Sequence, residues 1–235
     1  MNNINPASPK EFMEKDGDDL TIKFKNRLEQ NPDDIGACFC LAQICIMTGK
    51  EDQGIEYAKK CISLLPQNDQ PLPNHPQPIH FYRAIYHILA MALIKTDRCH
   101  EALDVINKGL EKLPGNIDLL HDLACVGYFL DDPDIIIEGG EAYLKQINDS
   151  HGNSTTRDHE PLVIVSTQDP WTILCVKFYL MTAYLSKRQF DLYEKMWAAG
   201  RYLMQHPPGL HKDLLSSIDH SGSLTYLEQA VDIIR

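Results

Sequence analysis

The sequence is poor in basic residues, and this limits the partners that it can bind. Its 235 residues include 22 Lys and Arg against 33 Asp and Glu, which gives a formal net charge of -11. Nucleic acids and anionic membranes are bound by clustered Lys and Arg side chains, so we expect neither as a partner. The excess of carboxylates indicates a solvated acidic surface.

Long apolar runs are also lacking. The longest, ILAMALI at residues 88–94, is far too short to span a bilayer. The first residues, MNNINPASPKEF, contain neither a basic region nor an apolar core, so we expect no secretory signal. Seven cysteines without such a signal indicate a reducing compartment. We therefore expect a soluble, cytoplasmic protein.

Local motifs for catalysis and cofactor binding are missing. The sequence contains no C-x2-C pair, no HExxH, no GxGxxG, no P-loop and no GxSxG. Cys38, Cys40 and Cys45 lie close together, but on a helix Cys40 points away from the other two, and free cysteine is commonly a small buried residue. We expect Cys38, Cys45 and Cys61 to pack in the core, with a Cys/His metalloprotein as an alternative. We predict neither enzymatic activity nor a cofactor.

A helix that ends at proline recurs along the chain. HEALDVINKGLEKLPGN (100–116) has apolar residues three or four positions apart and stops at Pro114. Two earlier segments, QGIEYAKKCISLLPQN and DDLTIKFKNRLEQNPDD, end in the same way at Pro66 and Pro32. Pro32 and Pro66 are 34 residues apart, and Pro66 and Pro114 are 48 apart, or 34 plus a 14-residue insert rich in Pro, Asn and Gln. A fixed period with loop insertions is typical of a helical array.

A Leu-Ala pair precedes these helices at a constant phase. The pairs are Leu41-Ala42, Leu89-Ala90 and Leu123-Ala124. They predict a first helix in each unit, which a short turn at 48–50, 96–98 or 131–133 joins to the second helix. We attribute Gly139-Gly140, inside a second helix, to close helix packing. Since one helix pair cannot bury its apolar surface alone, neighbouring pairs must stack.

This pattern resembles the tetratricopeptide repeat (TPR) family over residues 35–148. The 34-residue period, the Leu-Ala pair, the small residue that opens the second helix (Gly54, Ala102) and the terminal proline (Pro66, Pro114) match the family pattern. The tryptophan and the aromatic residue usual in the two helices are replaced by Cys38, Tyr86 and Leu120, and by Ala58, Ile106 and Gly140. The resemblance implies an all-α, right-handed α-solenoid of stacked antiparallel helix pairs with loop insertions.

We expect residues 1–235 to form one such domain. Its predicted parts are a degenerate N-terminal repeat (1–34), repeats at 35–68, 83–116 and 117–148, an insert (149–168), a degenerate repeat (169–208) and capping helices (209–235). Within them we predict a helix start at Ser8-Pro9, a second one at Asp18-Asp19, a helix end at Asn148, an extended segment at 162–165 and a helix start at Asp169-Pro170.

The resemblance implies a non-catalytic scaffold that binds a peptide or helix of a partner protein in the concave groove lined by the first helices. By phase, the inward positions are Phe39, Gln43, Ile46, His87, Met91, Ile94, His121, Cys125, Tyr128, Leu180 and Tyr184. The other reading is that several of them pack against the insert or the tail. An alternative function is an accessory module that assists a glycosyltransferase or another enzyme in trans.

The inward positions also bear on the charge of the partner. Members of this family that clamp acidic tails place Lys, Asn and Arg at positions that here hold Phe39, Gln43, Ile88, Asp118 and Asp122. Two carboxylates in a groove would repel an acidic ligand. We therefore expect a basic or neutral protein partner.

Overall fold

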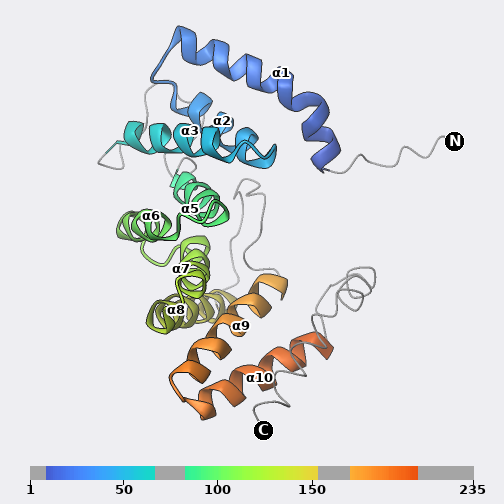
Figure 1. The fold of residues 1–235 in the computed structure, drawn as a ribbon, viewed down its shortest axis with the longest axis vertical. Coiled ribbons are helices and arrows are strands. Elements are labelled where there is room, and N and C mark those ends of the chain that lie inside the picture. Colours follow the sequence, from blue (N-terminus) through green and yellow to red (C-terminus); the bar gives the residue numbers. More distant parts are fainter. Residues whose placement is uncertain (1–8, 67–82, 153–169, 206–235) are drawn as a thin grey trace, which may run out of the picture.

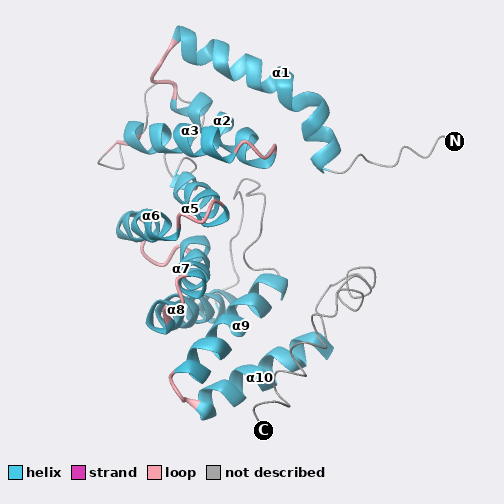
Figure 2. Ribbon diagram, viewed as in Figure 1, coloured by secondary structure: helices cyan, strands magenta, loops and turns pink. Residues whose placement is uncertain are grey.

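The computed structural model describes residues 9–66, 83–152 and 170–205, and nearly all of this part is helical (Figure 2). The helices are α1 (Pro9–Gln30), α2 (Ile35–Met47), α3 (Glu51–Leu64), α5 (Ile85–Lys95), α6 (Cys99–Lys112), α7 (Ile117–Phe129), α8 (Pro133–Gly152), α9 (Pro170–Ser186) and α10 (Phe190–Gln205). They follow one another in chain order along the longest axis of the molecule (Figure 1). The described residues contain no strand, and the predicted all-α helical-repeat solenoid is confirmed.

The same tight turn joins α2 to α3, α5 to α6, α7 to α8 and α9 to α10. One residue of each turn has a positive φ: Gly49 (76°), Asp97 (60°), Asp131 (54°) and Arg188 (57°). The amide of the following residue donates to the carbonyl five residues earlier, from Lys50 to Cys45 at 2.8 Å and from Gln189 to Tyr184 at 2.7 Å. This Schellman hydrogen bond closes the first helix, and the second helix starts at once.

These turns show that the helix pairs share one register. Counting back seven residues from the positive-φ residues leads to Ala42, Ala90, Ala124 and Met181, each of which follows a buried leucine. The three Leu-Ala pairs therefore occupy equivalent places, as predicted. In the last described pair the same place is held by Leu180-Met181.

Stacking continues from one helix pair to the next. Each second helix packs on the following first helix, α3 on α5, α6 on α7 and α8 on α9. The first helices also pack on one another, α2 on α5, α5 on α7 and α7 on α9, whereas α3, α6 and α8 have no comparable mutual packing in the described part. The first helices therefore form the inner row of the stack.

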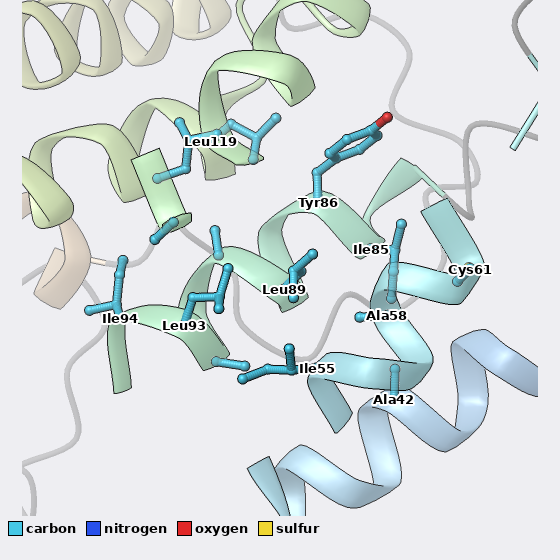
Figure 3. Close-up of a cluster of buried hydrophobic side chains, with 14 of the residues drawn as sticks. Ala42, Ile55, Ala58, Cys61, Ile85, Tyr86, Leu89, Leu93, Ile94 and Leu119 are labelled. Carbon is cyan, nitrogen blue, oxygen red and sulfur yellow. The ribbon is translucent and has the colours of Figure 1, made fainter. Parts of the chain in front are cut away.

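The apolar core runs between the stacked helices. Figure 3 shows its larger cluster, in which Ile55 and Ala58 of α3 face Leu89 and Leu93 of α5. A second cluster, which includes Tyr143, Val176 and Leu180, joins α8 to α9. The predicted core packing of Cys38, Cys45 and Cys61 is confirmed, since all three are buried. Burial raises the pKa of these thiols and disfavours the reactive thiolate.

Small residues allow neighbouring helices to approach closely, both within a pair and between successive pairs. A Cβ on Gly54 of α3 would lie 2.5 Å from Ile46 Cγ1 of α2. A Cβ on Gly139 of α8 would lie 2.5 Å from the Ala124 nitrogen of α7, and one on Gly140 would lie 2.7 Å from Leu180 Cγ. The packing role predicted for these two glycines is confirmed.

In the third pair the small residue of this contact lies in the first helix instead of the second. Ile136 of α8 lies five residues after the positive-φ residue Asp131. In the first two pairs the equivalent position holds Gly54 and Ala102. In compensation, Gly127 of α7 stands where α5 has Leu93, and a Cβ on it would lie 2.8 Å from the Ile136 nitrogen. The contact is preserved because a loss of volume on one helix matches a gain on the other.

Side-chain caps fix three of the helix starts. Asp34 Oδ1 accepts from the Ala37 amide at 2.9 Å to cap α2, and Asp34 Oδ2 pairs with Arg27 of α1 at 2.7 Å. Asn116 and Asp132 cap α7 and α8 in the same way. Each cap satisfies an amide that the helix leaves free and contributes about 1 kcal/mol.

Two predicted helix boundaries are wrong. The first repeat has one continuous helix, α1, where two helices meeting at Asp18-Asp19 were predicted. Residues of low helix propensity other than proline cost at most about 1 kcal/mol each inside a helix, so the two aspartates do not stop it. The helix predicted to end at Asn148 continues to Gly152, since no proline follows Asn148 to stop it. The predicted segments at 162–165 and 209–235 lie outside the described residues.

Ala90→Asp should unfold the middle of the stack, because it places an unpaired carboxylate in a fully buried helix contact. We expect the free energy of unfolding, measured by urea denaturation, to fall by at least about 3 kcal/mol. Asn107→Asp on the exposed face of α6 serves as the control and should change it by less than about 0.5 kcal/mol. Equal losses in the two variants would contradict the assigned packing.

Arg188→Gly should stabilise the protein, since Arg188 adopts a positive φ that costs a side chain free energy and that glycine adopts freely. We expect a gain of about 1 kcal/mol in the free energy of unfolding. The reverse change, Gly49→Ala, should cost about 1 kcal/mol for conformational reasons alone, because no atom lies within 4 Å of the added Cβ. Shifts of the same sign in both variants would show that the turns are not equivalent.

Candidate protein-interaction surface

The common register allows the expected inward positions to be compared from one first helix to the next. Counting back ten, six and three residues from each positive-φ residue gives Phe39, Gln43, Ile46, His87, Met91, Ile94, His121, Cys125, Tyr128, Phe178, Thr182 and Leu185. The first nine are the positions expected from the sequence. In α9 the row falls on Phe178, Thr182 and Leu185, two residues away from the expected phase. Leu180 and Tyr184 instead face α8, where Leu180 packs on Gly140 and the Tyr184 hydroxyl donates to Glu141 at 2.7 Å.

Burial divides the expected binding residues into two groups. Phe39, Ile94, Cys125, Leu180 and Tyr184 are buried among other apolar side chains. Gln43, Ile46, His87, Met91 and His121 are half-buried, and Tyr128 is exposed. Only the second group offers surface to a ligand.

A carboxylate between two imidazoles lies at the centre of the inner row. His87 Nδ1 of α5 lies 2.7 Å from Asp122 Oδ2 of α7, and His121 Nδ1 lies 3.3 Å from Asp122 Oδ1. The Asp122 side chain is 0% exposed, whereas those of His87 and His121 are 15% and 14% exposed. The carboxylate is thus sealed inside the stack, and only the imidazoles reach its surface.

Charge pairing decides the protonation of this cluster. Burial would lower the pKa of His87, but the charge and the hydrogen bond of Asp122 outweigh it and raise the pKa to about 9. Burial would raise the pKa of Asp122, but His87 and His121 hold it below its usual range. At neutral pH an imidazolium on α5 therefore binds a carboxylate on α7 and ties the second helix pair to the third.

This pairing changes the role expected of Asp122. The sequence placed its carboxylate in the groove, where it would repel an acidic ligand. The structure buries it and neutralises its charge with His87. No local sequence signal reveals the pair, because its members are 35 residues apart on successive repeats.

Four aromatic rings cluster where the inner row passes from α7 to α9. The Tyr128 ring lies in the middle, with its centroid 4.9 Å from Tyr179, 5.8 Å from Phe129 and 5.9 Å from Phe178. Tyr128 is 38% and Phe129 is 58% exposed. We call these four residues the aromatic cluster. Such large exposed apolar side chains in a group are typical of an interaction surface.

One ring of the aromatic cluster is held by a hydrogen bond to a buried cysteine. The Tyr179 hydroxyl donates to Cys125 Sγ at 3.8 Å, and burial raises the pKa of Cys125 to about 11. Cys125 is therefore a packing residue rather than a nucleophile. Phe129, Phe178 and Tyr179 were not predicted from the sequence; the correct phase of α9 would have identified Phe178.

The described part of the chain contains neither a candidate metal site nor a membrane-spanning helix. There, no group of three or more His, Cys, Asp or Glu side chains is placed to hold a metal ion. No described helix is long and apolar enough to cross a membrane.

The stability of the protein should fall as the pH rises from about 6.5, the pKa of His87 in an unfolded chain, to about 9, its pKa in the fold. The ion pair contributes fully below this interval and is lost across it. We expect a decrease of at most about 3 kcal/mol in the free energy of unfolding, measured by urea denaturation at several pH values. His87→Gln should remove this decrease while all other titrating groups stay the same. An unchanged pH slope in the variant would rule out the ion pair.

A scan of protein-family models and a search of curated proteins find no match. Several solved structures are similar to the chain. MamA shares 17% identity, with 83% of this chain and 94% of that chain covered and a TM-score of 0.57. YrrB, described as a TPR protein with an unusual peptide-binding site, shares 11% identity, with 87% and 90% covered and a TM-score of 0.57. The Cut9–Hcn1 hetero-tetramer of the APC/C shares 16% identity, with 90% and 33% covered and a TM-score of 0.55. The protein therefore has the fold of the tetratricopeptide-repeat proteins.

Proposed function

We propose that the protein is a non-catalytic scaffold that binds a segment of a partner protein on the inner row of first helices. The observation that carries this proposal is the exposed aromatic cluster around Tyr128, which lies in the same row as the half-buried Gln43 and Met91. Aromatic and methionine side chains supply most of the binding energy in many interfaces.

The polar groups of the inner row are arranged for packing rather than for catalysis. His87 and Asp122 are engaged with each other, and burial raises the pKa of Cys125. In the described part, no buried side-chain nitrogen or oxygen lacks a hydrogen-bond partner. A ligand would therefore meet a surface that is mostly apolar and whose buried polar groups already have hydrogen-bond partners. Such a surface suits the side chains of a peptide or helix.

The structural neighbours support the same class of function. YrrB is described as having a peptide-binding site, and Cut9 is part of an assembly with Hcn1. Both statements concern those proteins, and the shared fold makes a protein partner a reasonable proposal for this one. The net charge of -11 and the half-buried Asp118 favour a basic or neutral partner.

Met91→Glu combined with Tyr128→Glu should abolish partner binding and leave the fold intact, because the two carboxylates enter the inner row at positions that reach the surface. The measurement is affinity capture by the immobilised full chain, with mass spectrometry of the recovered proteins. We expect the amount of specific partner to fall at least about tenfold.

Gln53→Glu combined with Asn107→Glu is the matched control, since it adds the same charge to exposed positions of α3 and α6. Circular dichroism establishes that both double variants are folded. If the inner-row variant still binds the partner and the control variant does not, the binding site lies on the second helices. Recovery of one enzyme in equimolar amount would instead favour an accessory module.

A further inference from the structure

We propose that the aromatic cluster receives an arginine or lysine side chain from a partner segment that is otherwise apolar. This inference rests on the proposed function and specifies the chemistry of the partner at one place in the inner row. It follows from the exposed aromatic residues of the cluster and from the carboxylates in the turn that follows them.

The rings provide a surface for a cation. Tyr128 contacts the three other rings of the cluster and is itself 38% exposed, and Phe129 beside it is 58% exposed. The face of an aromatic ring carries partial negative charge, which attracts ammonium and guanidinium groups while the ring also packs on the aliphatic stem of the same side chain. Aromatic faces therefore accept Arg or Lys better than a carboxylate.

The turn that directly follows Tyr128 and Phe129 in α7 carries negative charge. Asp131 is exposed, and its amide donates to the Tyr128 carbonyl at 3.3 Å, so its backbone directly follows the turn of α7 that carries Tyr128 and Phe129. In the described part of the chain its carboxylate takes part in no ion pair or side-chain hydrogen bond. Tyr128 and Phe129 also form the last turn of α7, at the end of the helix where the helix dipole is negative.

The neighbouring turn offsets only part of this charge. Lys187, just after α9, pairs with Asp134 of α8 at 2.7 Å, which places the two turns side by side. The turn after α7 carries Asp131 and Asp132 and is followed by Asp134 in the first turn of α8, whereas the turn after α9 carries Lys187 and Arg188. The local balance stays negative, and Asp131 is the carboxylate left for a ligand.

The experiment selects a displayed library of random heptapeptides on the immobilised full chain, in parallel with the Tyr128→Ala variant. Peptides that the natural chain enriches and the variant does not should carry Arg or Lys next to Leu, Ile, Met or an aromatic residue. The strongest of them is synthesised, and its Kd is measured by fluorescence anisotropy. Replacing its Arg or Lys by Gln should weaken binding by about tenfold.

Point variants then locate the cation. Tyr128→Ala should raise the Kd by at least about tenfold, and Asp131→Asn should raise it by about threefold and reduce its dependence on salt. Phe190→Ala, an exposed aromatic residue outside the cluster, and Asp104→Asn, an exposed aspartate of α6, should each change the Kd by less than about twofold. Asp131→Asn changes only a surface group, so its effect does not depend on how well Tyr128→Ala folds.

The outcomes separate this inference from the proposed function. Peptides that depend on Tyr128 but are neutral or acidic would overturn the cation site and leave the scaffold function standing. Peptides that are enriched equally on the natural chain and on Tyr128→Ala would do the same. A failure of the natural chain to enrich any peptide would overturn both.

Discussion

Eight residues separate a buried leucine in each first helix from the left-handed residue that ends the helix, and the stack depends on this spacing. It runs from Leu41 to Gly49 and recurs in every helix pair through Leu180 and Arg188. Since an α-helix turns about 100° per residue, an equal spacing gives each turn the same direction relative to the core. Every second helix then leaves at the same angle, and the next pair can stack on it.

The constant spacing leaves the individual side chains free to differ. A close helix contact is made by Ala102 in the second pair and by Gly127 in the third, because volume lost on one helix is regained on the other. On the inner row the same freedom gives His87 and His121 at one position and Phe178 at the equivalent position of α9. The same positions of successive first helices thus contribute to a buried ion pair in one place and to an exposed aromatic cluster in another.

Much of the fold could be predicted from the sequence because the Leu-Ala pairs and the prolines report the period directly. The phase of α9 could not be predicted, because Met181 stands where the other first helices have alanine. In addition, the turn residue there is Arg188, and arginine rarely adopts a positive φ. Phe178 was missed for the same reason, whereas Phe129 and Tyr179 each follow an inward position by one residue and so lay outside the expected row. The bond between His87 and Asp122 was missed because Asp122 lies beside the inward position, and its burial is favourable only with an imidazolium from another repeat.

The exchange of small and large residues in the third pair offers the most direct test of the shared register. Gly127→Leu with Ile136→Ala would give this pair the residues that the second pair has as Leu93 and Ala102. Each single change should destabilise the protein, by overpacking or by a cavity. If the places are equivalent, a double-mutant cycle will show the double variant at least about 1 kcal/mol more stable than the sum of the single losses. Additive losses would contradict the register and, with it, the assignment of the inner row.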